Sequence, residues 1–109
     1  MEILQIENKW KWGYDITLIS EGCGIVEIQF EDGYEWGYIT NLKVHPSRKK
    51  QGIATGLMQK AEEVIKEEGY DEAQLWVEKE REWVYEWYKR MGYKMITDKD
   101  GFYKMRKLL

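Results

Sequence analysis

Residues 42–55 read LKVHPSRKKQGIAT, and they divide the chain into two parts with different hydrophobic periods. Before this stretch, apolar residues alternate with polar ones, whereas after it they recur every three or four positions. Alternation is typical of half-buried β-strands, and the longer period is typical of an amphipathic helix. The stretch therefore predicts a strand that ends near Val44 and a helix that begins near Gly52, joined by a basic loop.

Four β-strands are expected before the loop. Tyr14, Ile16 and Leu18 alternate with polar residues, which is the pattern of a strand with one buried face. Asp32-Gly33 is a common signal for a tight hairpin turn between two such strands. The expected strands cover residues 2–7, 14–18, 26–30 and 36–44, the first of them at an edge of the sheet.

Two helices and three further strands are expected after the loop. Gly69 stands where the left-handed cap of the first helix should fall, and Gly92 ends the second helix. The first helix is marked by the apolar residues Ile53, Leu57, Met58, Ala61, Val64 and Ile65. The later elements cover residues 73–77 (a strand), 83–91 (a helix), and 93–97 and 102–108 (a hairpin).

This order of elements predicts an α/β (α+β) fold, with one mixed, mostly antiparallel sheet of about seven strands and two main helices packed on its faces. The 109 residues, 43% of them hydrophobic, suffice for one core. No linker or internal repeat divides the chain, so a single domain over residues 1–109 is expected.

Charge and cysteine content narrow the function classes. The 17 basic and 20 acidic residues give a net charge of −3, which disfavours a nucleic-acid binder that works by phosphate neutralisation. Cys23 is the only cysteine and is expected to be a small strand residue, which leaves no disulfide framework or cysteine-based metal site. The sequence has no cationic leader or long apolar segment, so a soluble, cytoplasmic protein is expected.

The basic loop has the features of an anion site. A helix N-terminus presents up to about four unpaired backbone N–H groups and a partial positive charge. Gly52 and Ala54 would let an anion approach these groups. The cations Arg48, Lys49 and Lys50 would surround it. An ordinary basic loop before a helix has the same features, so the loop alone leaves both interpretations open, although a Walker P-loop is excluded because GxxxxGK[ST] is absent.

Two segments of the chain resemble the GNAT acyltransferase superfamily. Residues 42–54 are similar to the family's strand end, Val-x-Pro turn and (Arg/Gln)-x-x-Gly-x-(Gly/Ala) loop. Residues 87–93, WYKRMGY, resemble its Phe-Tyr-x-Lys-x-Gly-Phe signature. The order of the two segments, and their separation by a helix and a strand, make the pair more specific than either alone. From about Tyr14 onward, the chain is thus similar to a small, minimal GNAT member.

The resemblance implies an N-acetyltransferase that moves an acetyl group from acetyl-CoA to a primary amine by direct attack in a ternary complex. It implies that Tyr88 protonates the departing thiolate of coenzyme A. Glu78 would be the general base, with Glu35 as a weaker candidate and water as another. Backbone groups of Leu42 and Val44 would align the thioester and stabilise the oxyanion. The implied cofactor-binding residues are Leu42, Lys43, Val44, Lys49, Lys50, Gln51, Gly52, Ile53, Ala54 and Thr55, and no metal is implied.

The chain also departs from the family pattern. Lys49 stands where Arg or Gln is usual and Lys50 where glycine is frequent, so a bidentate side-chain contact is lost while the backbone site remains. The family usually has one or two helices after its first strand, which wall the acceptor site, whereas here only residues 8–13 separate the first two strands. The N-terminal helices are thus expected to be reduced or absent. The acceptor site is expected to be open, or completed by a second subunit of a homodimer.

Five of the six tryptophans divide into two groups. Trp76, Trp83 and Trp87 lie on apolar faces of predicted elements, and we expect them in the core. Trp10 and Trp12 fall in a short polar segment where burial is difficult. They are candidates for the acceptor site or for a dimer contact.

Other functions stay open at this point. In a non-catalytic acyl-CoA-binding or protein-interaction module, Tyr88 would be an ordinary core aromatic and Glu78 a solvated carboxylate. An oligonucleotide-binding sheet is disfavoured by the acidic balance and by the absence of an RNP-like aromatic motif. The acceptor, a small-molecule or peptide amine, is not identified by any motif.

Overall fold

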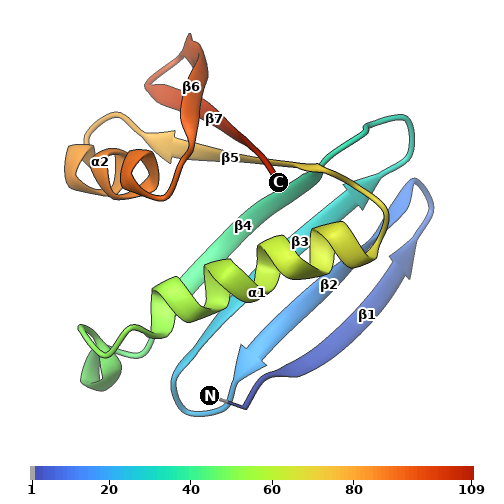
Figure 1. The fold of residues 1–109 in the computed structure, drawn as a ribbon, viewed down its shortest axis with the longest axis horizontal. Helices are drawn as coiled ribbons and strands as arrows, with labels where there is room; N and C mark the ends of the chain where they lie inside the picture. The colour runs from blue at the N-terminus through green and yellow to red at the C-terminus, as the bar shows by residue number, and fades with distance from the viewer. Residues whose placement is uncertain (1) are drawn as a thin grey trace.

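The computed structural model of the chain describes residues 2–109 and shows a twisted sheet with two helices packed on it (Figure 1). The strands are β1 (Leu4–Trp10), β2 (Gly13–Ser20), β3 (Gly24–Glu31), β4 (Gly37–Val44), β5 (Glu72–Glu78), β6 (Lys94–Lys99) and β7 (Phe102–Leu108). The helices are α1 (Ile53–Glu67) and α2 (Glu82–Arg90), and a short 3-10 turn, η1 (Pro46–Arg48), follows β4.

The strands form one sheet in the order β1-β2-β3-β4-β5-β7-β6. Only β4 and β5 pair in parallel, and every other neighbouring pair is antiparallel. Short turns join β1, β2, β3 and β4 in succession. The chain then passes from β4 to β5 through α1, which is the crossover that a parallel pair needs. The predicted mixed, mostly antiparallel sheet of seven strands with two helices is confirmed.

Two details of the N-terminal strands differ from the prediction. β1 does not end at Glu7 but pairs with β2 as far as the contact between Trp10 and Gly13. Every residue of this edge strand is exposed, so β1 lacks the buried-and-exposed alternation by which strands are recognised. The expectation that Cys23 lies in a strand is wrong, because Cys23 lies in the turn between β2 and β3, where its carbonyl accepts a hydrogen bond from the His45 N–H.

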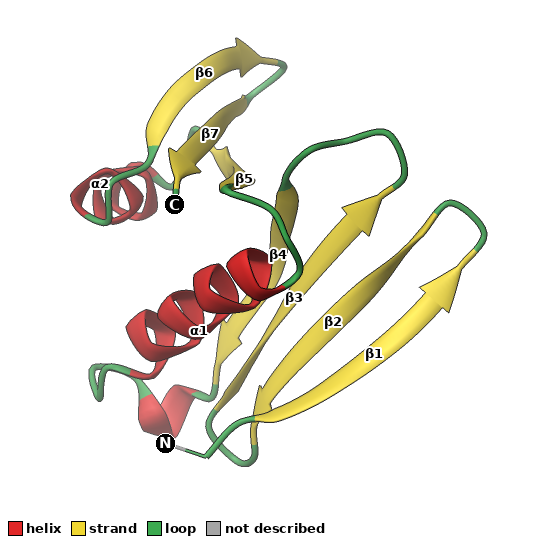
Figure 2. Ribbon diagram, turned by 45° about the vertical axis from the view of Figure 1, so that its right-hand side comes forward, coloured by secondary structure: helices red, strands yellow, loops and turns green. Residues whose placement is uncertain are grey.

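Both helices cover the same face of the sheet (Figure 2). Right-handed crossovers from β4 to β5 and from β5 to β6 advance in the same direction across the sheet, so their helices fall on one side. Ile28 of β3 and Leu75 of β5 are buried on this side, and a Cβ built on Gly37 of β4 would meet the Ile65 side chain of α1 at 2.5 Å. The core lies between this face and the two helices.

The opposite face of the sheet, here called the open face, carries no helix within residues 2–109. Trp76 points to it from β5, between the buried residues Leu75 and Val77, and is 39% exposed. Trp83 is 70% exposed at the start of α2. The prediction that Trp76 and Trp83 belong to the core is therefore wrong, because no layer covers either indole, whereas Trp87 is half-buried against the core as expected.

Residues 2–109 contain no helix that is both long and apolar enough to cross a membrane. In the same part of the chain no helix precedes β4. A two-residue turn at Lys11-Trp12 joins β1 directly to β2. Residues 2–44 thus contribute strands and turns, and no helix, to the fold.

Candidate active site

The sheet splits where β4 and β5 diverge. Their parallel pairing is limited to two contacts, Gly37 with Ala73 and Tyr38 with Gln74. Beyond these residues the two strands separate (Figure 1). Residues 39–44 therefore have a strand partner only on the β3 side. Such a free edge presents backbone N–H and C=O groups that can pair with an extended ligand.

A β-bulge lies in β4 beside this gap. The register with β3 shifts between Ile25 and Glu27, so that Asn41 and Leu42 together stand opposite Val26. Asn41 has a φ of 54°, in the left-handed region, which asparagine tolerates better than most residues. A bulge re-aims the groups around it. The backbone N–H and C=O groups near Leu42 are thus turned out of the regular ladder.

The N-terminus of α1 lies open. Gly52 is the N-cap residue, with a φ of 77° that favours glycine, and it has no side chain to cap the helix. Its carbonyl accepts the first helical hydrogen bond, from the Gly56 N–H, while the N–H groups of residues 52–55 have no acceptor within the described chain. A Cβ built on Gly52 would meet no atom within 4 Å. Four N–H donors are thus available to an anion.

Three exposed cations, Arg48, Lys49 and Lys50, precede this helix start. None of them is in an ion pair within residues 2–109, and the first turn of α1 contains no acidic residue. The His45 Nδ1 accepts a hydrogen bond from the Ser47 N–H at 3.2 Å, which holds the 3-10 turn. Cations beside the positive end of a helix dipole repel it, so this arrangement favours a bound anion. The structure therefore contains the basic loop and open helix start that the sequence predicts.

Tyr88 projects from α2 into the core and is 8% exposed. Its ring packs against Trp87 and Tyr93, with centroid distances of 4.9 and 5.6 Å. Burial raises the pKa of the Tyr88 phenol to about 12, and the Arg81 charge opposes this effect in part. Tyr88 is therefore protonated at neutral pH, so it has a proton to donate, although its raised pKa makes it a weaker acid than an ordinary tyrosine.

The neighbours of Tyr88 are held in place from α1. The Tyr93 Oη donates a hydrogen bond to Glu62 Oε2 at 2.8 Å, and the Lys107 Nζ donates to Glu62 Oε1 at 2.9 Å. Glu62 belongs to α1, whereas Tyr93 follows α2 directly. The two helices are thus linked by this hydrogen-bonded set, which fixes the ring against which Tyr88 packs.

Glu78 and Glu35, the two predicted candidates for the base, lie in different places. Glu78 is exposed at the end of β5, on the open face, because side chains alternate along a strand and Val77 is buried on the helix face. Tyr88 approaches from the helix face, so Glu78 and Tyr88 lie on opposite sides of the sheet. Glu35 precedes β4, at the end of that strand away from the bulge.

Sequence reasoning missed a third carboxylate, Glu27 of β3. It lies on the open face beside the bulge, where its Oε2 accepts a hydrogen bond from Asn41 Nδ2 at 2.9 Å. Its Oε1 accepts a hydrogen bond from Gln29 Nε2 at 3.3 Å. The one available signal was Asn41, a residue type depleted in strands. A bulge has no periodic signature, so the contact itself could not be predicted.

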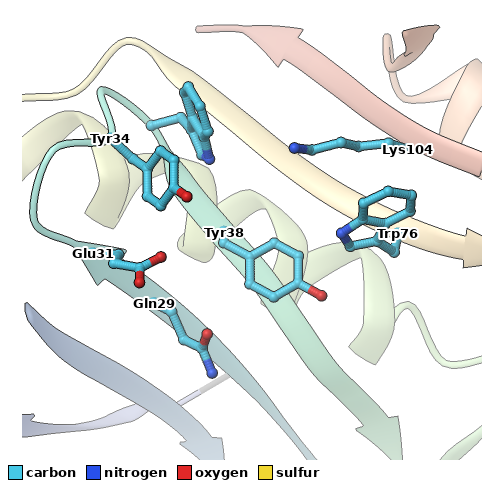
Figure 3. A pocket seen from close by; sticks show the side chains of 7 residues that line it. Gln29, Glu31, Tyr34, Tyr38, Trp76 and Lys104 are labelled. Carbon is cyan, nitrogen blue, oxygen red and sulfur yellow. The ribbon is translucent and has the colours of Figure 1, made fainter. Parts of the chain in front are cut away.

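A cavity of about 290 Å³ lies on the open face where β3, β4, β5 and β7 meet. Figure 3 shows Glu31 and Tyr34 on one side of it and Trp76 and Lys104 on the other. The Lys104 Nζ lies 5.4 Å from the ring centroids of both Trp36 and Trp76. The lining residues are Gln29, Glu31, Tyr34, Trp36, Tyr38, Trp76 and Lys104. The sequence did not indicate this cavity, because it suggested a buried place for Trp76.

Trp10 and Trp12 do not line this cavity. Trp12 is 61% exposed in the turn between β1 and β2, and its carbonyl accepts a hydrogen bond from the Asp32 N–H. Trp10 ends β1 on the open face, where its Nε1 donates a hydrogen bond to Asp15 at 3.1 Å. Their suggested contact with an acceptor or a second subunit stays a hypothesis.

Comparison with protein families identifies the class of protein to which this fold and site belong. The model of the acetyltransferase (GNAT) family matches residues 12–93, a range that includes β4, the basic loop and Tyr88. The chain belongs to the GNAT acetyltransferase family. No protein of curated function matches its sequence significantly.

Solved GNAT structures share the fold at low sequence identity. PaiA N-acetyltransferase from Thermoplasma acidophilum, in complex with coenzyme A, has a TM-score of 0.75 and 18% identity, over 87% of this chain and 60% of that one. An aminoglycoside 6′-N-acetyltransferase complexed with coenzyme A has a TM-score of 0.73 and 18% identity, over 86% and 72%. A GNAT family acetyltransferase from Elizabethkingia anophelis with acetyl-CoA bound has a TM-score of 0.72 and 14% identity, over 89% and 76%. The match thus spans 60% of the length of the PaiA chain.

Proposed function

We propose that the protein binds acetyl-CoA and transfers its acetyl group to an amine. One observation carries the proposal: a loop of residues 45–51 joins β4, the strand with a free edge, to the open N-terminus of α1. This N-terminus has unpaired N–H groups and cations beside it. Structural relatives solved with coenzyme A or acetyl-CoA support this choice of cofactor. We further propose that residues 1–109 form a single acyltransferase domain.

The residues around the helix start fit a pyrophosphate. The N–H groups of residues 52–55, from Gly52 and Ile53 to Ala54 and Thr55, would donate hydrogen bonds to its oxygens. The side chains of residues 48–50 would neutralise its charge, and Gln51 adds an exposed amide beside them. The open space at the Gly52 Cβ position gives the anion room to approach.

The free edge of β4 fits an extended amide-containing chain. Backbone groups of Leu42, Lys43 and Val44 would pair with the pantetheine arm as an added strand would. The Leu42 or Val44 N–H, re-aimed by the bulge, would donate a hydrogen bond to the thioester oxygen and stabilise the negative charge that develops there. Bound acetyl-CoA would supply the activated acetyl group.

Two side chains would move protons on opposite faces of the sheet. Glu78, on the open face, would accept a proton from the acceptor amine, which must be neutral to attack the thioester directly. Tyr88, on the helix face, would donate its proton to the departing sulfur. Its raised pKa keeps that proton in place at neutral pH. The acceptor, a small-molecule or peptide amine, would approach from the open face, where the aromatic cavity lies.

Amine-dependent release of thiol from acetyl-CoA tests this function. A panel of small amines and short peptides is mixed with the protein, and Cys23, the only cysteine, contributes a constant background. We expect turnover with at least one acceptor class, a loss of about 100-fold or more in Glu78→Gln, and little change in Glu80→Gln, the exposed carboxylate two residues further on. Coenzyme A binding without turnover on any amine would instead support the non-catalytic binding module.

A further inference from the structure

Exposed apolar side chains form two clusters on the open face. Alternation along β1 places Leu4, Ile6 and Trp10 on this face, with exposed fractions of 49%, 52% and 36%. Trp76 of β5 and Phe102 of β7 form the second cluster, on the other side of β4, with their rings packed edge to face at 6.4 Å. A partner that covered the whole face would bury both clusters, which is favourable.

On either side of β4 and β5, charged side chains on the open face are separated by sign. Residues paired across neighbouring strands share a face, so the register assigns each side chain to its side. β2 and β3 place carboxylates on the open face, whereas β6 and β7 place cations on it. The carboxylates are Asp15, Glu27 and Glu31, and the cations are Lys94, Lys99, Lys104 and Arg106. Between them, β4 and β5 carry the uncharged Tyr38, Gln74 and Trp76. Glu72 is paired with Arg106 at 3.6 Å, and Lys43 and Glu78 lie at the ends where the two strands diverge.

We propose that a second copy of this chain covers the open face, in a two-fold dimer of two sheets packed face to face. A two-fold axis that runs along β4, the middle strand of the seven, and lies between the sheets places the β1–β3 half of each copy, with its carboxylates, over the half of the other copy that contains β5, β7 and β6, with its cations. An axis in the same plane but across the strands places like charges over like charges. The separation of charge therefore selects the first arrangement.

The size of the open face is sufficient for such a dimer. Seven strands spaced by about 4.8 Å, with seven residues at about 3.3 Å each, give a face of roughly 800 Å². A specific, stable interface buries about 800 Å² on each partner. The gap where β4 and β5 diverge reduces this area, so one face of the sheet supplies an interface near the lower end of the ordinary size range.

This arrangement has a consequence for the acceptor, which rests on the proposed function. The cavity is lined by Tyr38 of β4, on the axis, and by Trp76 of β5, beside it, so the second copy would form its missing wall. Strands run in the same direction in both copies about this axis, so the two divergences of β4 and β5 lie at the same end of the dimer. At that end each sheet has a gap between β4 and β5, so the two copies do not close over one another. The acceptor would enter through this opening.

Sedimentation velocity tests the dimer without any use of acetyl-CoA, so its failure is separate from a failure of the proposed activity. We expect a dimer at micromolar concentrations and a dissociation constant raised at least about tenfold by Ile6→Lys, which buries a charge in the interface. Leu4→Lys is a second variant at the same surface. Gln5→Lys, an exposed residue on the other side of β1, is the matched control and should leave the dimer unchanged.

A variant at the opposite edge separates a face-to-face dimer from pairing through the edge of β1. Lys94→Glu, on the exposed basic side of β6, should weaken a face-to-face dimer because it replaces a cation by a carboxylate on the half that faces the carboxylates of the other copy. A dimer that Lys94→Glu leaves unchanged would overturn the proposal, as would a wild-type chain that stays monomeric at every soluble concentration. Circular dichroism confirms that each variant is folded.

Discussion

The two helices lie on the same face of the sheet, yet their N-termini are built differently. α1 begins after Gly52, with three cations before it and no acidic residue in its first turn. α2 begins after Arg81, whose carbonyl accepts hydrogen bonds from the Val84 and Tyr85 N–H groups at 2.9 and 3.2 Å, and it carries Glu82 in its first turn. The Arg81 N–H donates to the Glu78 carbonyl at 3.0 Å, so only the N–H groups of residues 82 and 83 lack an acceptor within the described chain, against four at the start of α1. Glu82 also adds a negative charge beside the dipole of α2, whereas the charges beside that of α1 are positive.

This difference indicates a division of roles. α1 provides its open end, which we propose binds the cofactor phosphates, and α2 provides the side chain of Tyr88, which we propose serves the chemistry. Cofactor affinity and turnover should therefore respond to different substitutions.

The largest expected effect is on turnover, at α2. Tyr88→Phe removes the proposed proton donor and should lower kcat by about 100- to 10,000-fold. The affinity for acetyl-CoA should stay nearly unchanged, since the aromatic ring remains. Steady-state kinetics and calorimetry on the same preparation measure both quantities. Tyr85→Phe, on the same helix, is the control, and an equal loss in both variants would contradict a specific role for Tyr88.

A smaller effect is expected on affinity, at α1. Replacing Arg48, Lys49 and Lys50 together by Gln should weaken acetyl-CoA binding by roughly 10- to 100-fold at low salt, because charge-assisted contacts to phosphate are lost. The kcat at saturating acetyl-CoA should be retained. Lys66→Gln, at the other end of α1, should change neither quantity. If the triple variant bound acetyl-CoA as tightly as the wild type at low salt, the three cations would not be part of the binding site.

The smallest effect is on stability, and it distinguishes the buried tyrosine of α2 from any group at the open end of α1. The pKa of Tyr88 is raised to about 12 in the folded chain, above the value of about 10 for an unfolded tyrosine. The folded state therefore binds the proton more tightly, so this contribution to stability is present below pH of about 10 and is lost as the pH rises toward 12. Burial also raises the pKa of Tyr93.

Denaturant unfolding at several alkaline pH values measures this effect. Between neutral pH and pH of about 12, the free energy of unfolding of the wild type should fall by on the order of 2 kcal/mol more than that of Tyr88→Phe. Parallel pH profiles for the two proteins would show that Tyr88 does not titrate as its burial requires.

The same comparison shows what could be predicted from the sequence. The start and end of α1 could be predicted from the apolar stripe between Gly52 and Gly69. The basic loop could be identified directly from its residues. Alternation also shows which residues share a side of a strand. It does not show which side a helix covers, so the exposure of Trp76 could not be predicted. The bulge at Asn41 and the cavity on the open face depend on register between distant strands, which no local pattern carries.

The most direct test of the account is a calorimetric titration of coenzyme A into the wild type, Gly52→Trp and Gly69→Trp. Both glycines have positive φ and open space at the Cβ position, at opposite ends of α1, so the two substitutions impose similar strain on the fold. We predict micromolar binding to the wild type and to Gly69→Trp, and none to Gly52→Trp, whose indole would fill the anion site. No binding to the wild type, or undiminished binding to Gly52→Trp, would contradict the claim that the N-terminus of α1 holds the cofactor.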